Sequence, residues 1–218
     1  PQSTGLYGDA FAIFKTEKSD KIYGLNGSGK SPSGIDSSLV ISAGHTKMPV
    51  NDVHSITLPG AVALFEELAS KFGKLGLSEL CTEPIKYAEE GVVVSPRVSF
   101  DWYQSYEKFS SKTKEYYLIN GKVPKPGDIF RAPGQATVFK KISTEGAKGF
   151  YESEITEDFI NSLKTLFRLC LVTFNLKINS PKFIPGFLSI RCKALKWAGP
   201  KYFFDKISLG SEKVSLYA

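Results

Sequence analysis

Residues 9–34 read DAFAIFKTEKSDKIYGLNGSGKSPSG, in which two apolar runs flank a polar turn and lead into a loop rich in glycine and serine. The first run covers residues 9–15 and the second covers residues 21–25. Short runs of this composition, separated by turn residues, are typical of a β-hairpin. We therefore predict two antiparallel strands, followed by a loop over residues 26–34.

Downstream of this loop, apolar residues recur at helical spacing. A helix is predicted to begin at Pro59, because proline is favoured in the first turn, and to end at Gly73. The face of this helix that is expected to be buried carries Val62, Phe65, Leu68 and Phe72. Further helices are predicted over residues 78–90, 98–109, 135–145 and 153–166, and Pro84 is expected to kink or split the first of them. The predicted elements are those of a mixed α+β protein.

The composition excludes several classes of protein. Of the 218 residues, 42% are hydrophobic and 23% are charged, which suits a packed core, and no apolar stretch is long enough to span a membrane. The three cysteines (Cys81, Cys170 and Cys192) are scattered and form neither a disulfide framework nor a zinc site. His45 and His54 are expected on the surface or in loops rather than as metal ligands.

Basic residues are concentrated in the last quarter of the chain. The formal net charge is +6, from 28 Lys and Arg against 22 Asp and Glu. Residues 167–218 contain only two acids, against nine basic residues: Arg168, Lys177, Lys182, Arg191, Lys193, Lys196, Lys201, Lys206 and Lys213. The remainder is close to neutral, so the chain lacks a uniformly basic surface and we expect no nucleic-acid partner.

Beyond residue 166, apolar residues follow neither the helical period nor the alternation of a strand. Two interpretations of this basic tail stay open. It is either a small β-rich extension with both faces buried or sequence that is out of frame. The second interpretation rests on the conflict between local sequence patterns in this tail, since such patterns agree with one another in the rest of the chain.

Residues 24–31 read GLNGSGKS and match the G-x-x-x-x-G-K-[ST] pattern of a phosphate-binding loop. In such a loop Lys30 would contact the terminal phosphate and Ser31 would hold Mg²⁺. The geometry also needs a helix that opens at residues 29–31, and Pro32 disfavours that helix. We therefore favour a plain loop after a strand and keep nucleotide binding through residues 24–31 as an alternative.

Four stretches of the chain form an ordered series. They are PQSTGLYGDAFAIF (1–14), YGLNGSGKSPSG (23–34), SITLPGAVALFEELASKFGKLGLSELCTEPIKYAEEGVVVSP (55–96) and KPGDIFRAPGQATVFKKISTEGAKGFYESEI (125–155). This series resembles the γ-glutamyltransferase (γ-glutamyltranspeptidase) family over residues 1–166, and the order and spacing of the stretches make the resemblance specific. Residues 167–218 depart from the family, which would continue with a Gly-Gly segment.

The resemblance implies a fold and a mechanism. Members are N-terminal-nucleophile (Ntn) hydrolases with an αββα sandwich, and this chain would supply part of it: the mostly helical large-subunit portion and an N-terminal hairpin. Members cut themselves into two subunits, and the threonine that begins the small subunit is the nucleophile, with its own α-amine as the base. That threonine has no counterpart in this chain, so no residue here is expected to be catalytic, and no metal or cofactor is expected.

One family position falls inside the chain. In well-characterised transpeptidases of the family, an arginine four residues before the proline of an Ala-Pro block binds the α-carboxylate of the glutamyl donor. Counting back four residues from Pro32 reaches Ser28. A serine cannot supply the charged, bidentate grip of a guanidinium. Either Lys30 binds the anion instead, or the substrate is not a γ-glutamyl α-amino acid. Ser28 and Lys30 are therefore the candidate substrate-binding residues, and the sequence is similar to a divergent, acylase-like branch.

The favoured interpretation is γ-glutamyl or related acyl transfer or hydrolysis by the full-length enzyme. The implied partners are a small-molecule γ-glutamyl or acyl-amide substrate and the missing small-subunit portion. The alternative within the same family is an inactive, truncated remnant. We also expect the isolated chain to be poorly stable, because its hairpin lacks a partner sheet.

Overall fold

The computed structural model describes residues 5–17, 20–32, 36–49 and 52–166. The predictions for residues 167–218, a β-rich extension or out-of-frame sequence, lie outside these residues. The described residues form two compact units, the first within Leu6–Phe65 and the second within Glu66–Leu169, to which Gly5 also belongs.

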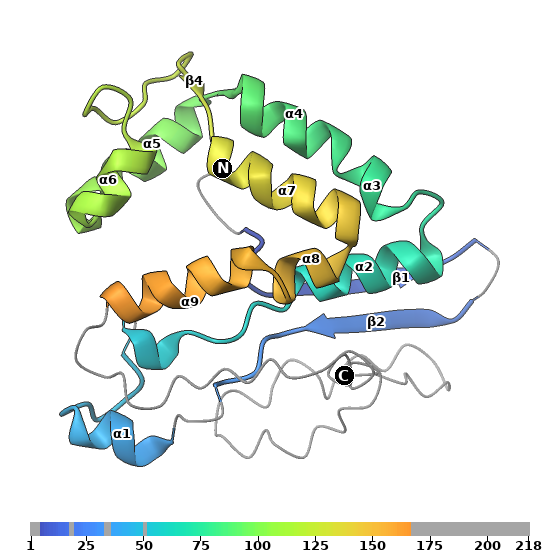
Figure 1. The fold of residues 1–218 in the computed structure, drawn as a ribbon, viewed down its shortest axis with the longest axis horizontal. Coiled ribbons are helices and arrows are strands. Elements are labelled where there is room, and N and C mark those ends of the chain that lie inside the picture. Colours follow the sequence, from blue (N-terminus) through green and yellow to red (C-terminus); the bar gives the residue numbers. More distant parts are fainter. Residues whose placement is uncertain (1–4, 18–19, 33–35, 50–51, 167–218) are drawn as a thin grey trace. The chain divides into compact units, whose positions relative to one another are not determined.

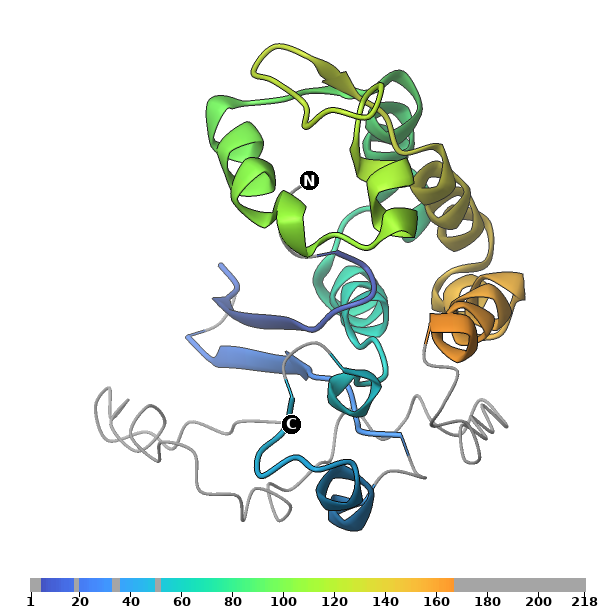
Figure 2. The ribbon, with the colours of Figure 1, turned by 90° about the vertical axis from the view of Figure 1, so that its left-hand side faces the viewer.

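The first unit contains the predicted hairpin. Strand β1 (Ala10–Lys15) pairs antiparallel with β2 (Ile22–Gly27), in a register that runs from Ala10 opposite Gly27 to Lys15 opposite Ile22 (Figure 2). The prediction is confirmed, although β2 extends two residues beyond the expected end. Alternate side chains face opposite sides of a strand, and here Phe11 and Ile13 are each 66% exposed. One face of the hairpin is therefore apolar and open.

Two short elements follow the hairpin in this unit. Helix α1 (Ser37–Ser42) was not expected from the apolar pattern, and it is fixed by Asp36, whose carboxylate accepts the N–H groups of Ser38 and Leu39. Hydrogen bonds from the hydroxyl and N–H of Ser38, and then from Leu39, lower the pKa of Asp36. A 3₁₀ turn, η1 (Val53–Ser55), lies between α1 and the next helix.

Helix α2 (Ala61–Phe72) begins two residues after the predicted start at Pro59. The carbonyl of Gly8 accepts the N–H groups of Gly60 at 3.1 Å and Ala61 at 3.0 Å, which satisfies donors that a helix leaves unpaired at its start. Gly73 follows the last residue of the helix, as predicted.

The second unit is mostly helical. Its helices are α3 (Leu77–Leu80), α4 (Thr82–Glu90), α5 (Pro96–Ser105), α6 (Ser111–Tyr117), α7 (Pro133–Glu145), α8 (Ala147–Tyr151) and α9 (Glu154–Leu166), with a 3₁₀ turn η2 (Tyr106–Lys108). Helix α7 packs along α3 and α4 (Figure 1). The helices predicted at 98–109, 135–145 and 153–166 are present with shifted ends. None of the helices in the described part of the chain has the length and hydropathy needed to cross a bilayer.

The helix predicted over residues 78–90 is split in two, as Pro84 suggested. The break lies at Cys81, between α3 and α4, and Pro84 falls in the first turn of α4, where a missing N–H costs nothing. The Cys81 side chain is buried at this break, and burial raises the pKa of its thiol.

An aromatic cluster forms the core beside α5. Strand β3 (Val92–Val93) pairs with β4 (Ile129–Phe130), and this pairing brings Phe130 to Trp102. The ring centroids of Trp102 and Phe130 lie 4.8 Å apart in an edge-to-face arrangement, which is a favoured aromatic geometry. The buried members of the cluster are Val94, Val98, Trp102 and Phe130.

Trp102 and its neighbour Tyr103 provide a test of this core. Trp102 is 4% exposed and Tyr103 is 67% exposed. Trp102→Ala should lower the free energy of unfolding by about 3–5 kcal/mol, because it removes the centre of the aromatic cluster. Tyr103→Ala, on the same helix, should change it by less than about 0.5 kcal/mol. Urea titrations followed by circular dichroism measure both values, and equal effects would contradict the described core.

Candidate functional site

The loop after β2 carries both predicted substrate-binding residues. The side chains of Ser28 and Lys30 are exposed, whereas the backbone between them is held in place. The carboxamide oxygen of Asn26 accepts the N–H of Ser28 at 2.9 Å, and the Oδ1 of Asp9 accepts the N–H of Gly29 at 2.8 Å. The carbonyl of Lys30 accepts the N–H of Leu58 at 2.9 Å. The loop is thus tied to the start of β1 and to the segment that precedes α2.

Three glycines allow these backbones to approach one another. A Cβ on Gly29 would lie 1.6 Å from the carbonyl oxygen of Leu58, and a Cβ on Gly60 would lie 2.1 Å from that of Gly27. On Gly27, a Cβ would meet the Leu64 side chain at 2.8 Å. Each distance is too short for a real Cβ, so the glycines are needed for packing.

The structure does not contain a phosphate-binding loop at residues 24–31. Lys30, Ser31 and Pro32 are not helical, and the next described helix, α1, begins only at Ser37. The N–H of Gly29, which would face a phosphate, already donates to the Asp9 carboxylate. The described residues therefore lack the helix that a phosphate-binding loop needs, and this geometry favours a plain loop after a strand.

The two histidines differ in their surroundings. His45 is half-buried, whereas His54 lies in η1 and is 8% exposed, so the expectation of a surface or loop histidine is only partly correct. The Nδ1 of His54 lies 2.5 Å from the Oδ1 of Asp52, which also accepts the backbone N–H of His54. Sequence reasoning missed this pair, although the Asp-x-His spacing is the signal of such a local turn.

Asp52 is held as an anion by this turn. The hydrogen bond from the N–H of His54, followed by that from its ring, lowers the pKa of Asp52. Among the described residues no group of three or more metal-ligating side chains occurs. The contacts between Asp52 and His54 fix the turn in the segment that leads to Leu58.

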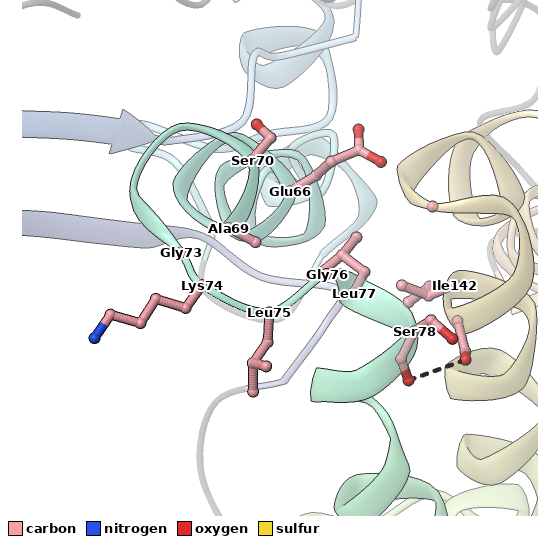
Figure 3. Close-up of a pocket in the computed structure, with 12 residues that line it drawn as sticks. Glu66, Ala69, Ser70, Gly73, Lys74, Leu75, Gly76, Leu77, Ser78 and Ile142 are labelled. Carbon is pink, nitrogen blue, oxygen red and sulfur yellow. Dashed lines mark hydrogen bonds between the residues drawn. The ribbon is translucent and has the colours of Figure 1, made fainter.

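An open pocket of about 480 Å³ lies in the second unit, between α2 and α7. Figure 3 shows its lining, in which Ser143 donates to the carbonyl of Ser78 at 3.3 Å and the Lys74 side chain extends away. The carboxylate of Glu66 accepts the N–H of Ala147 at 2.8 Å. The pocket's polar groups thus bind the chain itself, and neither Ser28 nor Lys30 lines it.

Comparisons with known proteins extend these observations. The family model described as gamma-glutamyltranspeptidase matches residues 1–166. A glutathione hydrolase-like YwrD proenzyme of Bacillus subtilis is 26% identical over 167 residues, which are 75% of this chain and 31% of that protein. The capsule biosynthesis protein CapD proenzyme of Bacillus anthracis is 30% identical over 114 residues, which are 52% of this chain and 22% of that protein.

Solved structures show the same relationship. A cephalosporin acylase from Bacillus halodurans superimposes with a TM-score of 0.69 at 30% identity, covering 77% of this chain and 33% of the acylase. The gamma-glutamyltranspeptidase of Helicobacter pylori superimposes with a TM-score of 0.68 at 26% identity, covering 73% of this chain and 47% of that one. The two Bacillus subtilis relatives that match three quarters of this chain are much longer than it is. The match spans only about a third of their length.

Gly29→Ala should disrupt the loop. The added Cβ would overlap the carbonyl of Leu58, and relief of that overlap requires the backbone to move. We expect the free energy of unfolding to fall by about 1–3 kcal/mol. Gly134→Ala is the matched control, because a Cβ there meets nothing within 4 Å at the start of α7 and alanine favours a helix. Urea midpoints of both variants test the contact, and a loss equal to that of the control would refute it.

Asp52 should make stability depend on pH in the acid range. Its folded pKa is below the ordinary value of 3.8, so its contribution is complete above that value and is lost as the pH falls through the folded pKa. Asp52→Asn should therefore destabilise the chain at pH 6, and the difference from wild type should shrink below about pH 4. Urea midpoints across pH 3–6 provide the measurement, and parallel profiles would contradict the assignment.

Proposed function

Since this chain belongs to the gamma-glutamyltranspeptidase family, we propose that it forms the N-terminal part of the large subunit of an acyl-transferring or acyl-hydrolysing enzyme. The reaction proceeds through an acyl-threonine intermediate, and the donor is a γ-glutamyl or related acyl amide. The threonine lies outside this chain, as does its α-amine base. Both of the relatives described above, and others, are named as proenzymes, which supports autocatalytic cleavage of the whole protein.

The chain's own contribution is to bind the acyl donor. The exposed side chains of Ser28 and Lys30 project from a loop whose backbone is fixed by hydrogen bonds to Asp9, Asn26 and Leu58. This combination is the observation that carries the proposal, because a rigid loop loses little entropy when a ligand binds. Ser28 donates or accepts a hydrogen bond, and the ammonium group of Lys30 donates one. The bound carbonyl is then held for attack by the threonine.

The proposed fold is part of an αββα sandwich that further strands complete. The open face of the hairpin supports this, because Phe11 and Ile13 are largely exposed and a sheet buries such a face against a second sheet. We propose that the small-subunit portion of the enzyme supplies that covering. Within this chain, residues 1–166 are the family segment, and the basic tail of residues 167–218 is a separate region.

The first experiment reads the coding DNA on both sides of this segment and expresses the product of its uninterrupted frame. The full-length protein should cut itself into two subunits and release p-nitroaniline from an acyl anilide, with an initial burst as the acyl-enzyme accumulates. A full-length protein that is cut but cleaves no acyl anilide would contradict the reaction. A frame that ends without the threonine segment would identify the inactive remnant.

Variants of the loop test donor binding. Lys30→Ala should raise KM for the acyl anilide about tenfold with a smaller effect on kcat, because it removes a binding contact rather than a reacting group. Lys148→Ala is the control, since this lysine is also exposed but lies in the second unit. Equal KM values for the two variants would remove Lys30 from the site.

A further inference from the structure

We propose that Asp9 determines donor specificity, and that the loop of residues 28–30 takes acyl donors which carry no carboxylate at the end that it binds. This inference rests on the proposed function, because it concerns the same loop. It decides between the two possibilities left by Ser28: a lysine that replaces the arginine, or a different donor.

The position of the Asp9 carboxylate is the first observation. Its Oδ1 accepts the N–H of Gly29 at 2.8 Å. Gly29 lies in sequence between the two candidate binding residues, Ser28 and Lys30. Within the described part of the chain, the Asp9 carboxylate accepts this hydrogen bond through Oδ1. Asp9 is exposed, so its second oxygen can accept a hydrogen bond from a ligand. The Asp9 side chain thus places a negative charge against the backbone of the loop.

The charge balance of the loop follows from this position. A backbone N–H that could hold an anionic oxygen is taken by the protein's own carboxylate, and a second carboxylate there would be repelled. Ser28 carries no charge, and the formal charges of Lys30 and Asp9 sum to zero. The loop therefore has no surplus positive charge with which to bind an α-carboxylate.

The same groups suit another class of ligand. The second carboxylate oxygen of Asp9 can accept a hydrogen bond from an amine or amide, and the hydroxyl of Ser28 either donates or accepts. A donor with an ammonium group or an uncharged polar group fits this pair of side chains. The class is represented by 4-aminobutyryl amides, which are γ-glutamyl amides without the α-carboxylate.

Two substitutions separate the charge of Asp9 from its hydrogen bond. Asp9→Asn removes the charge but keeps an oxygen that accepts from Gly29, whereas Asp9→Ala removes both. Asp20→Asn is the matched control, because Asp20 is an exposed aspartate of the same unit that lies at the other end of the hairpin, beside Lys15. The NMR signal of the Gly29 amide should keep its hydrogen-bonded shift in Asp9→Asn and lose it in Asp9→Ala.

Binding is measured on the full chain with two small probes, L-glutamine and 4-aminobutanamide, which differ only by the α-carboxylate. Shifts of the amide signals of residues 28–30 report the affinity. In the wild type, 4-aminobutanamide should bind about fivefold or more tightly than L-glutamine. Asp9→Asn should reduce that ratio to about one by improving L-glutamine, and Asp20→Asn should leave it unchanged.

Several results would overturn the inference. They are tighter binding of L-glutamine in the wild type, a ratio that Asp9→Asn does not change, and the absence of shifts at residues 28–30 with both probes. Cleavage by the full-length protein is a separate readout, using the p-nitroanilides of γ-glutamate and 4-aminobutyrate. Discrimination in binding without cleavage of either anilide would refute the proposed reaction alone, and faster cleavage of the γ-glutamyl anilide would refute the specificity alone.

Discussion

The close approach of three backbone segments, made possible by Gly27, Gly29 and Gly60, holds the first unit together. No side chain separates the loop after β2 from the residues before α2, and a single methyl group at Gly29 would overlap the Leu58 carbonyl. The start of β1 joins the same junction, because Gly8 accepts from the first turn of α2 and Asp9 accepts from Gly29. Strand, loop and helix therefore take their positions from one set of main-chain contacts.

This constraint also changes the meaning of a familiar motif. The letters GLNGSGKS suit a loop that wraps phosphate groups with its N–H donors. Here the glycines serve contact between backbones, and the donors at Ser28 and Gly29 are used by side-chain oxygens of Asn26 and Asp9. A glycine-rich pattern indicates that another group lies close to the backbone of the loop. Only the fold decides whether that group belongs to a ligand or to the chain itself.

Local patterns predicted those parts of the fold that depend on local residues. The hairpin and the long helices follow from apolar spacing, and the split near Pro84 follows from proline chemistry. Strands β3 and β4 could not be predicted, since each has two residues and its partner lies more than thirty residues away. The same limit applies at the site: Ser28 and Lys30 lie in a readable motif, whereas the Asp9 contact spans twenty residues. The burial of His54 likewise depends on packing in the fold, which the residues next to it in sequence do not reveal.

Cys81 illustrates a consequence of the break between α3 and α4. Its side chain is 5% exposed, and burial raises its pKa, so very little of the reactive thiolate forms at neutral pH. Oxidants and alkylating reagents act on the thiolate, and they reach this buried sulfur only when the packing around it opens. Among the described residues, Cys81 is the one free thiol. The rate at which an electrophile modifies it therefore reports how often the helical unit opens.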